Sequence, residues 1–157
     1  MLTDMIHQFV AGSEAYRKAV EGIDDELART KTAPGSWSIL ELVVHVADAD
    51  AISIDRMKRI IAEDRPQLLN FDETAYVERL LPHEQSLEDA AALLEIGRRQ
   101  FARVLAKLPA DALARVGVHD IRGDVTARQL LTIITEHAEH HLKFLQAKRE
   151  RLGLIER

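Results

Sequence analysis

The stretch EHAEHHLKFL, residues 136–145, holds three of the chain's seven histidines, at His137, His140 and His141. Imidazole binds divalent transition metals and changes its charge near neutral pH. His137 and His141 are four residues apart, a spacing at which two imidazoles on one helix face can chelate a single ion. The cluster is therefore surface polarity, a pH-sensitive patch or part of a metal site, and its placement on the helix distinguishes these.

A helical wheel of about 100° per residue separates the three histidines. His137 and His141 fall within the apolar arc of this helix, whereas His140 falls on its flank. Buried imidazoles cost free energy unless each nitrogen finds a partner. Metal ligation and hydrogen bonds to neighbouring helices both remain open. The apolar arc consists of Leu130, Ile133, Ile134, Ala138, Leu142, Phe144 and Leu145.

A third ligand would strengthen the metal interpretation, and His45 is the candidate. It lies in the apolar segment SWSILELVVHVADADAISIDRM. The helix sector that holds His45 also includes the charged residues Asp55 and Arg59, so it could instead be the solvent face. Asp48, one turn later, is either a carboxylate that orients an imidazole or an exposed helix residue. Glu41 is explained by helix capping, and Trp37 by core or staple packing.

Composition bounds the remaining possibilities. The 157 residues predict one domain over positions 1–157, and the absence of cysteine excludes disulfides and thiolate ligands. A net charge of −5 argues against broad nucleic-acid binding. We find no signal peptide and no apolar run of about 18 residues, so we expect a cytoplasmic protein that does not act at membranes.

Long apolar-periodic segments rich in Ala, Leu, Glu and Arg predict an all-α fold. Ser38 with Glu41, Ser86 with Asp89 and Thr126 with Gln129 have the spacing of capping boxes. Four long helices with two long connections predict a four-helix bundle with long crossover connections, not necessarily of up-down-up-down order. The expected helices are residues 3–31 with a break near Gly22, 38–64, a short 72–80, 86–108 and 126–151.

Three features together resemble the DinB-like (YfiT-type) superfamily. The first is the pattern W-S-x-x-E-x-x-x-H-x-x-D from Trp37 to Asp48, and the second is H-x-x-H-H from His137 to His141. The third is the order of segments, including SLEDA at residues 86–90 and the run from His119 through Gly123 to Thr126. The resemblance covers nearly the whole chain.

The resemblance implies a four-helix bundle, often a homodimer, with one divalent metal held by His45, His137 and His141. Zinc or nickel suits such ligands. Three imidazoles leave coordination positions open, which is typical of catalytic sites. The expected function is a metal-dependent enzyme acting on a small molecule, either a hydrolase or a transferase using a low-molecular-weight thiol. Asp48, Glu41 and His140 are candidates for supporting or acid–base roles.

The alternatives are a non-catalytic metal-binding or stress-related bundle, and a dimerisation module whose buried histidines hold no metal. The other histidines carry less weight. His7 and His83 are expected at the surface, and His119 in a loop before the last helix, where it either folds over the site or is a plain loop residue.

Overall fold

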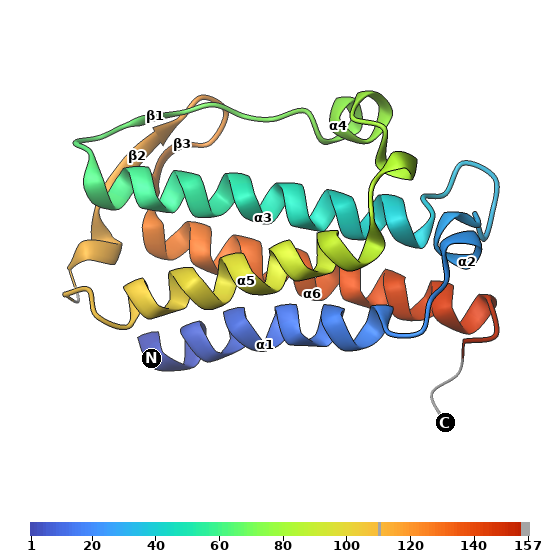
Figure 1. The fold of residues 1–157 in the computed structure, drawn as a ribbon. Helices are drawn as coiled ribbons and strands as arrows, with labels where there is room; N and C mark the ends of the chain where they lie inside the picture. Colours follow the sequence, from blue (N-terminus) through green and yellow to red (C-terminus); the bar gives the residue numbers. More distant parts are fainter. Residues whose placement is uncertain (110, 155–157) are drawn as a thin grey trace.

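Four long helices form the body of the computed structural model, which describes residues 1–109 and 111–154 (Figure 1). Two short helices, two 3-10 turns and a three-stranded sheet are attached to them. The long helices are α1 (Leu2–Val20), α3 (Ile39–Ala62), α5 (Leu87–Leu105) and α6 (Ala127–Arg151). The smaller elements are α2 (Asp25–Arg29), α4 (Glu73–Arg79), 3-10 turns at Pro82–Glu84 and Ala112–Ala114, β1 (Gln67–Leu68), β2 (Val116–His119) and β3 (Gly123–Thr126).

The bundle does not have simple up-and-down order. In Figure 1, α1 and α6 run in one direction, and α3 and α5 run in the other. Each helix packs against two neighbours, so the order around the bundle is α1, α5, α3, α6. Because α3 and α5 are parallel, residues 63–86 must return along the length of α3, and α4 forms part of this return. The predicted four-helix bundle with long crossover connections is confirmed.

Local capping explains where the helices begin. Ser38 Oγ accepts from the Glu41 amide, and Glu41 Oε2 accepts from the Ser38 amide at 2.7 Å. Thr126 and Gln129 exchange the equivalent pair of bonds at α6. The predicted break in the first helix is also confirmed, at Gly22 with a φ of +73°. The short helix α4 begins after Asp72, whose side chain caps the Ala75 amide.

A small sheet at the C-terminal end of α3 was not predicted. β2 pairs antiparallel with β3 and parallel with β1. A Cβ on Gly117 would lie 2.9 Å from side-chain atoms of Ile60 and Leu68, so only glycine lets β2 lie this close to α3. His119 is buried in β2 and not in a loop, and its Nδ1 accepts from the Ile121 and Arg122 amides. It therefore stabilises the hairpin.

Arg98 lies fully buried at the centre of the bundle. From α5 it donates to the Asp50 carboxylate of α3 at 2.6 Å, to the Phe9 carbonyl of α1 at 2.8 Å and to the Ile134 carbonyl of α6 at 3.1 Å. One side chain thus joins all four long helices. In the described residues, no helix is both long and apolar enough to cross a membrane.

We expect Gly12→Ala to destabilise the protein by about 1–3 kcal/mol, because the added methyl must displace a guanidinium fixed by hydrogen bonds. Its Cβ would lie 2.9 Å from Arg98 Nη1. Gly97→Ala is the matched control, since its Cβ would lie 3.5 Å from Ile54 Cδ1, an ordinary contact. Helix propensity should then stabilise it by up to about 1 kcal/mol. Urea unfolding measures both, and equal effects would contradict the expectation.

Candidate metal centre

Three histidines from two antiparallel helices converge in the structure. His45 comes from α3, and His137 and His141 come from consecutive turns of α6. One nitrogen of each ring lies within 4.8 Å of the other two, and the Nε2 atoms of His45 and His137 are 3.2 Å apart. His45 is buried, and the two α6 histidines are partly buried. The structure therefore brings together the three residues that the sequence singled out.

All three imidazoles are neutral near pH 7. Burial lowers the pKa of His45, His137 and His141 to about 4 each. The neighbouring imidazoles act in the same direction, because each ring opposes a positive charge on the next, and Arg98 adds to this effect at His137. Neutral imidazole is the form that binds metals, since its second nitrogen keeps a lone pair.

Each of the three rings also has one nitrogen without a hydrogen-bond partner. The Nδ1 atoms of His45, His137 and His141 are buried without a protein hydrogen-bond partner. A divalent ion would bind the convergent nitrogens, which include Nε2 of His45 and His137, and three imidazoles suit zinc or nickel.

Aromatic side chains surround the cluster on one side. The Trp37 ring centroid lies 4.9 Å from that of His45 and is stacked on His141 at 6.4 Å with an interplanar angle of 16°. Trp37 is therefore a wall of the site as well as a residue that precedes the helix cap. His140 is exposed, as the wheel predicted, and its ring packs against Phe144 at 4.8 Å.

The two predicted carboxylates lie elsewhere. Glu41 caps α3 and lies 3.3 Å from Lys31 Nζ and 3.2 Å from His83 Nε2. Asp48 lines a different cavity with Asp89 and residues around the start of α5, and burial there raises its pKa. The hydrogen bonds of the described residues join neither carboxylate to the three imidazoles, so an orienting role for Asp48 has no support in this geometry.

Glu73 approaches the cluster, and sequence reasoning missed it. Its Oε2 lies 4.0 Å from His45 Nε2, and its side chain is 54% exposed. Glu73 is the first residue of α4, which the return segment lays along α3 (Figure 1). The Asp72 cap predicts where α4 begins, but only the path of the crossover places its first residue beside His45. Glu73 thus contributes a carboxylate at the solvent side of the cluster.

A family model described as the DinB superfamily matches residues 8–145. The chain belongs to the DinB superfamily. This confirms the resemblance that the tryptophan–histidine and late histidine motifs indicated.

Curated relatives agree with this membership, and a solved structure shares the fold. A Geobacillus thermodenitrificans protein named "Putative metal-dependent hydrolase" is 27% identical over 89% of this chain and 79% of its own. A Geobacillus kaustophilus protein with the same designation is 30% identical, over 87% and 78%. The structure of Bacillus subtilis YfiT, titled a probable metal-dependent hydrolase with an unusual four-helix bundle topology, aligns at a TM-score of 0.87. That alignment has 24% identity and covers 97% of this chain and 87% of the other.

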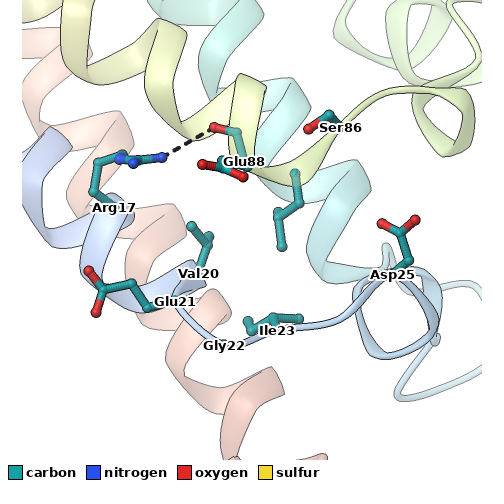
Figure 2. A pocket seen from close by; sticks show the side chains of 9 residues that line it. Arg17, Val20, Glu21, Gly22, Ile23, Asp25, Ser86 and Glu88 are labelled. Atoms are coloured by element: carbon teal, nitrogen blue, oxygen red, sulfur yellow. Dashed lines mark hydrogen bonds between the residues drawn. The ribbon is translucent and has the colours of Figure 1, made fainter.

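A larger cavity of this DinB-superfamily protein lies away from the histidines (Figure 2). Its volume is about 400 Å³, and it is formed where α1 ends and α5 begins. Arg17 donates to the Glu88 carbonyl across it, and Glu21 and Asp25 line its rim. Such a lining lacks the convergent neutral nitrogens of the histidine cluster. Size alone therefore does not identify the site. The imidazole nitrogens favour a smaller cavity of about 240 Å³, which His141 lines.

We expect about one transition metal per chain in protein purified without a nickel column. His141→Ala should lose it, because two imidazoles bind far more weakly than three. His140→Ala is the matched control, an exposed histidine on the same helix that should keep the metal. Mass spectrometry of both variants measures this. Wild-type protein that takes up no zinc or nickel would contradict the metal centre.

The metal-free protein should lose stability as pH falls from about 6.5 toward 4. Across this window the unfolded chain protonates these histidines, whereas the folded protein holds them neutral, so lowering the pH favours unfolding. Each histidine contributes at most about 1.4 kcal/mol per pH unit. Urea unfolding at several pH values in EDTA measures the slope. His45→Gln should reduce this slope by up to about 1.4 kcal/mol per pH unit, the contribution of one proton. An unchanged slope would contradict the prediction that the folded protein holds His45 neutral.

Proposed function

We propose that the protein is a metal-dependent hydrolase whose divalent metal is held by His45, His137 and His141. The observation that carries the proposal is the convergence of three neutral imidazoles, one buried and two partly buried, with nitrogens within 4.8 Å of one another. The names of the curated relatives support hydrolysis as the reaction class. Zinc and nickel are the metals that the ligand set favours.

A divalent metal held by these histidines would supply Lewis acidity for activating water and for polarising the bond that is cleaved. The chain's own residues complete the site. Trp37 and the apolar end of α3 exclude water from one side of the rings. Glu73 Oε2, on an exposed side chain beside His45, is placed to accept the proton that an attacking water would release. Its 4.0 Å separation from His45 Nε2 leaves it beside the ligands and within reach of an entering molecule.

Two alternatives from the sequence are tested by the same preparation. A transferase would require a low-molecular-weight thiol as co-substrate. A non-catalytic metal-binding protein would bind the ion without turning over any substrate. The partly exposed rings of His137 and His141 favour catalysis, because a purely structural site is closed by protein ligands.

The decisive experiment loads the protein with zinc or nickel and screens esters, amides and lactams for hydrolysis, with and without an added thiol. Glu73→Gln should reduce kcat by about 10²- to 10⁴-fold while leaving the metal content unchanged. Glu78→Gln, an exposed carboxylate on the same short helix, is the control and should retain activity.

Three results would go against the proposal. Turnover only with a thiol would identify the transferase. Full metal loading without turnover of any substrate would favour the non-catalytic protein. Activity that survives in His141→Ala would remove the histidine cluster from the reaction.

A further inference from the structure

An apolar cavity borders the histidine cluster where α6 passes the start of α3. His141 forms part of its wall, and its volume is about 240 Å³. Liquid water occupies about 30 Å³ per molecule, so the space equals roughly eight waters, or one aromatic ring with short substituents. Most of the remaining wall is apolar: Trp37, Leu42, Phe144 and Ala147.

Flat ring surfaces form the sides of this cavity. Trp37 and His141 are nearly parallel, at 16°, and the Phe144 ring centroid lies 6.0 Å from that of His141. Phe144 is 47% exposed although it is large and apolar, so part of its ring remains open to a ligand. Aromatic walls of this kind favour a planar apolar group, which gains offset or edge-to-face contacts in addition to burial.

Two cations line the same cavity at the end of α6, Lys148 and Arg151. Lys148 Nζ donates to the Trp37 carbonyl, which holds the ammonium at the cavity wall. Burial, followed by the charge of Arg151, lowers the pKa of Lys148. A helix C-terminus favours basic residues in general, but that does not select the face that they occupy. An anion placed between them would offset both the burial and the mutual repulsion.

The spacing along α6 sets the length of a ligand. His141 and Lys148 are seven residues apart, which corresponds to about 10 Å of helix rise. A molecule that reaches from the histidine nitrogens to the cations is therefore about one aromatic ring with a substituent at each end.

We propose that this cavity binds the substrate of the metal centre, and that the substrate is an aryl amide or ester carrying a carboxylate at its far end. The ring lies between Trp37 and Phe144, and the carboxylate pairs with Arg151 and Lys148. The scissile carbonyl then faces the histidine nitrogens. The assignment rests on the proposed function in taking the His141 end as the reacting end.

The test measures binding of 4-acetamidobenzoate to the zinc-loaded full-length protein by calorimetry, and by fluorescence of Trp37, the chain's single tryptophan. The uncharged 4-acetamidobenzamide is the matched ligand. Arg151→Gln should raise the Kd for the carboxylate about fivefold and leave that for the amide unchanged, because it removes an ion pair near the surface. Arg103→Gln, the same charge change on the exposed face of α5, should alter neither.

Ala147→Leu is the second variant, because it fills the cavity without changing charge. It should abolish the fluorescence response to both ligands while the circular dichroism spectrum and the zinc content stay as in the wild type. Equal affinities of the wild type for the two ligands, or wild-type binding by Ala147→Leu, would overturn the proposal. The proposal would also be overturned if His141→Ala removed binding of the carboxylate ligand while Arg151→Gln left it unchanged. The carboxylate would then bind the metal and not the cations.

The same titration in EDTA separates this proposal from the proposed function. Binding in EDTA that requires Arg151 supports the subsite even if the metal-loaded protein hydrolyses no substrate, which is the outcome that goes against the hydrolase proposal. A metal-loaded protein that does not bind the carboxylate overturns the subsite and leaves the metal centre intact.

Discussion

The structure depends on one buried interaction, the ion pair between Arg98 and Asp50. Both side chains are at most 2% exposed. Moving two charges out of water costs several kcal/mol per ion unless their hydrogen bonds are satisfied. Here they are satisfied by each other and by carbonyls of α1 and α6. The pair thereby fixes the relative positions of all four long helices, including α3 and α6, which carry the histidines.

The position of this pair also affects the chemistry of the site. Arg98 donates to the Ile134 carbonyl, one turn before His137, and its charge adds to the burial that keeps His137 neutral. Tyr16 donates to the Ala138 carbonyl at 2.9 Å, which fixes the next turn of α6 from α1. The Arg98 charge disfavours protonation of His137 and so leaves its lone pair available for an ion. The same packing that stabilises the bundle therefore also positions His137 and His141 on α6.

Three kinds of side chain surround the histidine cluster: apolar, cationic and acidic. Trp37, Leu42 and Phe144 provide an apolar wall, and Lys148 and Arg151 provide positive charge at the end of α6. The exposed side carries Glu73, supplied by the crossover that the parallel arrangement of α3 and α5 requires. The helix order thus affects the surroundings of the histidines, because a simple up-and-down bundle would have no return segment to place α4 beside His45.

His45 was singled out through the resemblance to the superfamily. The sequence by itself determined the long helices, their caps and the shared face of His137 and His141. These follow from local rules: periodicity places His137 and His141 on one face, and the serine–glutamate and threonine–glutamine pairs satisfy the first amides of α3 and α6. Only the tertiary structure decided the Arg98–Asp50 pair, the small sheet, the approach of Glu73 and the separation of Asp48 from the imidazoles. The ion pair, the β1–β2 pairing and the approach of Glu73 join residues tens of positions apart, and these contacts depend on helix order and crossover path, which local periodicity does not encode.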